Sequence, residues 1–202
     1  MKSSSLPIIL LLFIFGSLVA NCGNPSTEKQ HETAHSEETV PVDYMKLGAG
    51  IAGATRDALG KQLVQAISTL GTAKAIDFCN TRAIPLTDST AMAHNAKVKR
   101  VSDKARNPDN QANEKEIAIL QEWKEQQAKG DSITARLLEA DGKMIGYYPI
   151  KTNGMCLQCH GMSGKDILPD VLAAIQKNYP NDKATGYVAD QIRGMFVIEM
   201  DK

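Results

Sequence analysis

A pentapeptide late in the chain, Cys156-Leu157-Gln158-Cys159-His160, has residue types and a spacing that suit one specific chemistry. Two thiols three positions apart can add to the two vinyl groups of one haem, and a histidine directly after the second thiol can bind the iron as its proximal ligand. This spacing is typical of covalent haem c attachment. The sequence therefore predicts one haem c, with its iron, per chain.

Three other uses of the same cysteines need features that are harder to find. A structural zinc site needs four ligands, and only Cys79 and scattered histidines could complete it. A redox dithiol belongs at a helix start near a βαβ pattern and does not need His160. A plain disulfide does not need it either. The adjacent histidine favours haem over all three, and so does the export signal predicted for the first 21 residues.

The chain has four cysteines. Two belong to the haem pair, and Cys22 follows the export signal as the expected lipid-attachment site, so one thiol, Cys79, remains. A leftover thiol in an exported protein needs an explanation. Cys79 lies among apolar residues on an expected helix, and binding to iron would remove its thiol proton. We therefore expect Cys79 and His160 to be the two axial metal ligands. A buried, inert Cys79 is the alternative, and the other candidate ligands are His94 and the methionines, of which Met162, Met195 and Met200 follow the motif.

An axial thiolate has consequences for redox behaviour. It pushes electron density onto the iron and favours the ferric state, which predicts a low potential. Reduction, or a diatomic ligand on ferrous iron, could then release Cys79 and let its helix move.

Arginines are the expected partners of the haem propionates, because guanidinium binds carboxylates in bidentate fashion. Arg82, Arg100 and Arg106 are candidates, with surface solvation as the alternative for each. Arg106 is our choice as the cofactor-binding residue.

The first 21 residues have the layout of an export signal: Lys2, an apolar run, then small and turn residues. The exit from this segment, Leu18-Val19-Ala20-Asn21-Cys22, resembles a bacterial lipobox, although Asn21 stands where Gly, Ala or Ser is usual. We expect lipid attachment at Cys22, with an ordinary cleaved signal or an uncleaved anchor as alternatives. The polar, acidic segment 22–42 is expected to be a flexible tether that leads to the haem domain, 43–202. The predicted location is the periplasm or cell surface.

Hydrophobic periodicity predicts a mixed α+β domain built on a small antiparallel sheet. Pro85 is expected to stop the second helix, and Asp141-Gly142 predicts a hairpin. The expected helices are 44–70, 73–82, 114–129 and 166–178, and the expected strands are 97–106, 133–139, 143–150 and 193–200.

Four blocks of the sequence carry a family resemblance. They are Ala75-Ile76-Asp77-Phe78-Cys79-Asn80, the stretch 98–110 followed by Glu116, Tyr147-Tyr148-Pro149-Ile150 leading into the pentapeptide and Gly161, and the closing segment with Gly186-Tyr187 and 192–197. In these blocks the chain resembles exported PAS-like c-type haem domains, a domain family of unknown function, over residues 44–200.

The resemblance implies a PAS-like antiparallel sheet with N-terminal helices and one covalently bound haem c. It also implies axial ligands corresponding to His160 and Cys79. Members occur as the extracytoplasmic part of signalling receptors, which favours sensing. This chain shows no second membrane segment and no kinase portion. We therefore expect its output to pass through another protein.

Three functions are compatible with such a haem. A redox or diatomic-gas sensor is the leading hypothesis, and a one-electron carrier is the alternative. A peroxidase-like enzyme comes third, because no distal His/Arg pair is evident and a sixth ligand would block peroxide. We expect no enzymatic activity. The expected partner is a redox or signalling protein of the periplasm, and not nucleic acid, because the 23 basic and 23 acidic residues leave no basic field.

Overall fold

The structure is a computed structural model, and it describes residues 41–202. The predicted export signal, the lipid site at Cys22 and nearly all of the 22–42 tether lie outside the described residues. None of the helices within 41–202 combines the length and apolar character that a membrane span requires.

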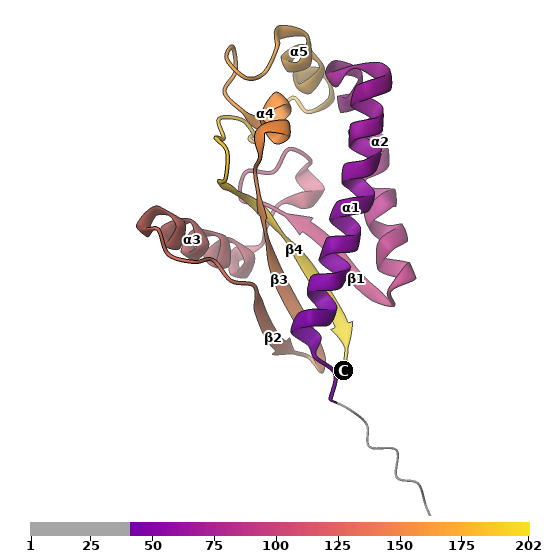
Figure 1. Cartoon of the computed structure of the whole chain (residues 1–202), viewed down its shortest axis with the longest axis vertical. Helices are drawn as coiled ribbons and strands as arrows, with labels where there is room; N and C mark the ends of the chain where they lie inside the picture. The colour runs from indigo at the N-terminus through magenta and orange to yellow at the C-terminus, as the bar shows by residue number, and fades with distance from the viewer. Residues whose placement is uncertain (1–40) are drawn as a thin grey trace, which may run out of the picture. The chain divides into compact units, whose positions relative to one another are not determined.

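The described chain forms a mixed α+β domain around one four-stranded antiparallel sheet, as predicted (Figure 1). The strands lie in the order β1-β4-β3-β2. In chain order the elements are α1 (Tyr44–Leu70), α2 (Thr72–Ala93), β1 (Ala96–Val101), the 3-10 turn η1 (Pro108–Asn110), α3 (Glu114–Lys129), β2 (Arg136–Ala140), β3 (Lys143–Lys151), α4 (Gly154–His160), α5 (Pro169–Asn178) and β4 (Ile192–Asp201).

Strand alternation gives the core one layer on each face of the sheet. A third cluster of buried residues packs α2 against α5. Tyr148 and its β4 partner Phe196 face α1 and α2, whereas Tyr147 and its partner Val197 face α3. Figure 1 shows α1 and α2 side by side, with α3 apart from them. A one-residue slip in register would exchange the two cores, so burial on both faces fixes the pairing.

Local chemistry accounts for the elements whose bounds were predicted best. Asn113 and Glu116 form a capping box at the start of α3, and Gly130 ends that helix in the left-handed conformation. Asp141 and Gly142, with φ of 51° and 71°, connect β2 to β3. Two adjacent positive φ values match the tight hairpin turn expected for Asp-Gly.

The predicted stop at Pro85 is wrong, because α2 continues through it to Ala93. A proline inside a helix removes a hydrogen bond and costs roughly 3 kcal/mol. Pro85 is itself exposed, and Ile76 and Ala91, on either side of it, are buried. Tertiary contacts of α2 with α1, α5 and β1 therefore outweigh the local cost.

The strand expected over 97–106 is shorter, because β1 ends at Val101. The Ser102 hydroxyl donates to the carbonyl of Arg193 at 2.7 Å and accepts from the amide of Lys104 at 3.1 Å, which turns the chain out of the sheet. Helix α4 was not predicted at all. Four other elements differ only at their ends. β2 and α5 each begin three residues later than expected, β2 and β3 each end one residue later, and β4 extends from Ile192 to Asp201.

Gly48 allows a close contact between α1 and the sheet. A Cβ at this position would overlap the Tyr148 hydroxyl, which donates to the carbonyl of Met45 at 3.0 Å. We expect Gly48→Ala to lower the free energy of unfolding by ~1–3 kcal/mol, as overpacking does in a filled core. Chemical denaturation measures the change.

Gly50 on the same helix is the matched control, because a Cβ there meets no atom within 4 Å. Gly50→Ala should raise stability by about 0.5–1 kcal/mol, since alanine has less backbone freedom to lose. Equal effects of the two substitutions would contradict the proposed contact.

Candidate cofactor-binding site

One cavity of about 310 Å³ brings together residues that are far apart in the sequence. Cys79, Arg106, Cys156, Cys159 and His160 all line it. The remaining walls are largely apolar and come mainly from α1 and α2, among them Leu59, Leu63, Ile67, Ile76, Phe78 and Ile84. The five residues singled out from the sequence therefore share one site.

Helix α4 presents the pentapeptide to this cavity. Asn153 caps the helix: its side-chain oxygen accepts from the backbone amide of Cys156 at 3.2 Å. Residues three and four apart lie on one helical face, which places Cys156, Cys159 and His160 together. Both thiols are free, and burial raises the pKa of Cys159 to about 11. The Cys159 thiol is thus neutral, and both α4 thiols line the shared cavity.

His160 is held as a neutral imidazole in one tautomer. Burial lowers its pKa well below the usual value, and the charges of Arg106 and Arg193 lower it further. Its Nδ1 lies 2.7 Å from the carbonyl oxygen of Ala184. Because a carbonyl can only accept, Nδ1 carries the proton. Nε2 is then left with a free lone pair, which is the form of histidine that binds a metal.

Cys79 lines the cavity from the middle of α2. Burial raises the pKa of its thiol, while the positive charges of Arg100 and Arg106 act in the opposite direction. A thiolate at this position would therefore have two nearby cations to stabilise it. The thiol stays protonated until something stronger, such as a metal ion, displaces the proton.

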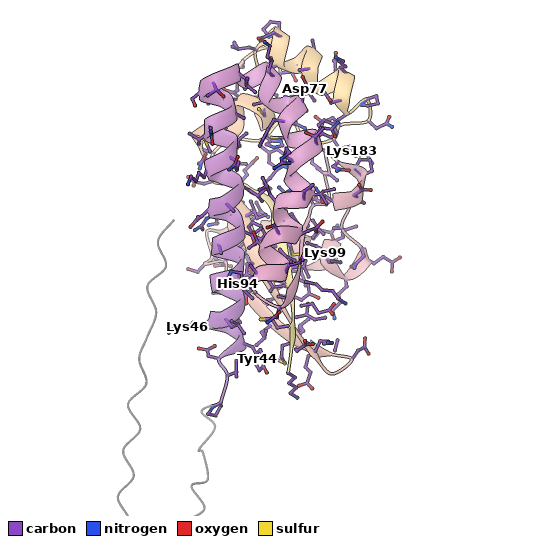
Figure 2. All side chains as sticks on the ribbon, turned by 90° about the vertical axis from the view of Figure 1, so that its right-hand side faces the viewer. Tyr44, Lys46, Asp77, His94, Lys99 and Lys183 are labelled. Atoms are coloured by element: carbon purple, nitrogen blue, oxygen red, sulfur yellow. The ribbon has the colours of Figure 1, made fainter. Side chains whose placement is uncertain are left out.

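The other candidate axial ligands differ in position. His94 is exposed at the far end of α2, and Figure 2 shows it distant from Asp77, which lies beside α5. Met162 is also exposed, and Met195 and Met200 are buried in the cores on the two faces of the sheet. Met155 does line the cavity, but it directly precedes Cys156 on α4. Within 41–202, no group of three or more His, Cys, Asp or Glu side chains is arranged to hold a bare metal ion.

The guanidinium of Arg106 is engaged on the α4 side of the cavity. It forms a bidentate pair with Asp182, at 3.1 Å and 3.0 Å, and donates to the carbonyl of Cys159 at 2.6 Å. The two paired side chains are only 11% and 9% exposed. A carboxylate that approached Arg106 would compete with Asp182, so the structure gives Arg106 a different environment from the one expected of a propionate partner.

Arg100 and Arg193 line the same cavity, and neither forms an ion pair with a carboxylate in the described part of the chain. Burial lowers the pKa of both guanidinium groups. Arg193 donates from Nη1 to the Ser102 hydroxyl at 2.7 Å, while its Nε is buried without a hydrogen-bond partner. Half-buried cations without counter-charges favour an acidic group in the cavity.

Comparison with known proteins places the chain in a family. The model of the Tll0287-like family matches residues 27–200. The chain belongs to this family. No curated protein matches it.

A solved structure shares the fold of this Tll0287-like protein. The crystal structure of the cyanobacterial haem protein Tll0287 is similar with a TM-score of 0.57, over 77% of this chain and 95% of that chain, at 22% sequence identity. At this identity the likeness concerns the fold alone.

Sequence reasoning missed one arginine in this Tll0287-like chain. Arg193 was not among the propionate candidates, although it directly precedes Gly194 in the closing segment. Gly194 was the available sequence signal, because a glycine inside a strand often marks a close approach of another backbone. In the structure a Cβ at Gly194 would overlap the carbonyl of Val101, so β4 and β1 approach closely beside the cavity. Of the predicted candidates, Arg100 lines the cavity and Arg82 is exposed on α2.

Proposed function

We propose that this protein binds one haem c covalently through Cys156 and Cys159, with His160 and Cys79 as the axial ligands of the iron. One observation carries the proposal: both thiols and a neutral imidazole from α4 line the same apolar cavity as Cys79 from α2. Membership of the Tll0287-like family supports it, as does a shared fold with a haem protein. We also propose that the four-stranded sheet with its N-terminal helices is PAS-like.

The cavity suits an amphiphilic group with a flat apolar body and carboxylate arms. The apolar side chains of α1 and α2 would cover the macrocycle. Arg100 and Arg193 would bind the propionates, because they are the lining guanidinium groups without a carboxylate partner in 41–202. His160 offers Nε2 to the iron, and Cys79 offers sulfur. The residues present therefore fit haem.

Bound haem supplies one-electron redox chemistry and an iron site for diatomic ligands. Cys79 would couple that site to the fold, because α2 contacts α1, α5 and β1. A change in the position of Cys79 would be passed to all three elements. This coupling favours redox or diatomic-gas sensing over simple electron carriage, which would need no movement of α2. We propose an exported protein without enzymatic activity that acts on a redox or signalling partner outside the cytoplasm.

Mass and spectra of the purified full chain test this function. After allowance for signal cleavage and for the lipid expected on Cys22, we expect the mass to exceed that of the polypeptide by one haem that survives denaturation. The ferric spectrum should be low-spin with thiolate character. Carbon monoxide added to the reduced protein should bind and displace Cys79. A polypeptide without covalent haem would contradict the binding proposal, and reversible redox cycling without carbon monoxide binding would favour the electron carrier.

A further inference from the structure

The segment that follows α5, residues 182–187, wraps around the end of α4. The Gly186 amide donates to the carbonyl of Gly161 at 2.8 Å, and the Tyr187 amide donates to the carbonyl of His160 at 2.9 Å. The ring of Tyr187 meets the His160 ring edge-on, with centroids 6.4 Å apart. The Ala184 carbonyl accepts the Nδ1 proton of His160. This segment, which we call the strap, therefore determines how the imidazole is oriented.

Two side chains from the turn after β1 hold the strap in place. Lys104 donates to the carbonyl of Thr185 at 2.8 Å. Arg106 pairs with Asp182, and Asp182 Oδ1 in turn accepts from the amide of Ala184 at 2.9 Å. The same guanidinium reaches the Cys159 carbonyl on α4. The guanidinium also donates to the Ala184 carbonyl itself, at 3.4 Å. Arg106 and Asp182 together thus hold Ala184, whose carbonyl orients His160, and connect it to α4.

We propose that the Arg106–Asp182 pair is a positioning pair for His160, which it aligns by fixing the Ala184 carbonyl. The inference rests on the proposed function, in which His160 binds the haem iron. A hydrogen bond from the second ring nitrogen makes a histidine ligand more basic and fixes its orientation. A more basic ligand stabilises the ferric state over the ferrous state, so loss of the alignment should raise the reduction potential.

The sign of the potential shift separates positioning from a simple charge effect. Removing the positive charge of Arg106 alone would lower the potential of a nearby iron, and removing the negative charge of Asp182 alone would raise it. The Arg106→Gln/Asp182→Asn double variant removes one charge of each sign, so the two effects largely cancel. A rise that persists in the double variant reports the loss of alignment.

Potentiometric titration of the holoprotein tests the proposal. We expect the double variant to favour reduction about tenfold more than the wild type, which is about 59 mV for a one-electron couple. Arg106→Lys, which keeps the charge but cannot form both hydrogen bonds to Asp182, should shift the potential in the same direction by less. Asp201→Asn is the matched control, because Asp201 pairs with Lys143 at the exposed end of the sheet and should leave the potential unchanged.

Two results would overturn the positioning role: a double variant with the wild-type potential, or single variants that shift it by equal amounts in opposite directions. If the double variant does not fold, Arg106→Lys replaces it, and a wild-type potential in Arg106→Lys would overturn the positioning role. The mass of each variant is measured first. Wild-type protein without covalent haem would refute the proposed function itself, whereas haem-loaded variants with unchanged potentials would refute only the positioning pair.

Discussion

Replacing Cys79 by serine is expected to remove the thiolate features from the optical and EPR spectra of the ferric protein and to raise its reduction potential. Serine is close to cysteine in size, but its hydroxyl holds its proton far more tightly and is a weak ligand for iron. The shift should be on the order of 0.1 V or more, within the ~0.8 V range over which axial ligands set haem potentials. Covalent haem should remain, because Cys156, Cys159 and His160 are untouched.

The surroundings of Cys79 support a large effect. Burial alone raises the pKa of this thiol, so a cysteine without iron would stay neutral. Arg100 and Arg106 oppose that shift. A thiolate bound to iron would therefore add a negative charge where two cations compensate it, and the serine variant would leave those cations without that charge. The loss of the thiolate and the two uncompensated cations both favour the ferrous state.

Met155 supplies the control for this prediction, because it is the methionine that shares the cavity with Cys79. Met155→Leu should leave the ferric spectrum and the potential close to those of the wild type. Methionine-type coordination that disappears in Met155→Leu, together with an unchanged spectrum in Cys79→Ser, would show that the predicted second ligand is wrong.

Cys79→Ser also tests the proposed coupling to α2. If release of Cys79 moves the helix, the oxidised serine variant should resemble the reduced wild type in the hydrogen-exchange protection of residues 76–86. The oxidised wild type should be more protected there. Identical protection in all three samples would favour the electron carrier over the sensor.

The sequence predicted those parts of the fold that depend on neighbouring residues. The Asp141-Gly142 hairpin and the capped α3 follow from local backbone chemistry, so the structure reproduces them closely. The pentapeptide also needs only its own spacing to indicate a chemistry. The shared cavity of Cys79 and α4 could be inferred only from a leftover thiol and from family resemblance.

Features that depend on distant contacts could not be predicted in the same way. α2 continues past Pro85 because three other elements pack against the helix, and none of these contacts can be read from the local sequence. The roles of the arginines also depend on distant contacts. Arg106 has a partner 76 residues away in Asp182, whereas Arg100 and Arg193 have no carboxylate partner in the described chain. Residue type alone could not distinguish a paired guanidinium from an unpaired one.

A Cys156→Ala/Cys159→Ala variant is expected to lose covalent haem and much of its thermal stability. An apolar cavity of about 310 Å³ left unfilled costs up to roughly 7 kcal/mol, at ~24 cal/mol per Å³. That is comparable with the whole stability of a typical domain, about 5–15 kcal/mol. The melting temperature should therefore fall by up to about 15–30 °C, since 1 kcal/mol shifts it by about 2–4 °C in a chain of this size.

Wild-type protein produced in cells that lack the haem-attachment machinery is the matched control, because it has the same cavity and both thiols but no covalent cofactor. Circular dichroism should give it the same low melting temperature as the double variant, and haem-loaded wild type should melt well above both. The single variants Cys156→Ala and Cys159→Ala should each keep one thioether and lie in between. If haem-free and haem-loaded proteins melted together, the cavity would not depend on the cofactor for its stability, and haem could not be the apolar group that completes this core.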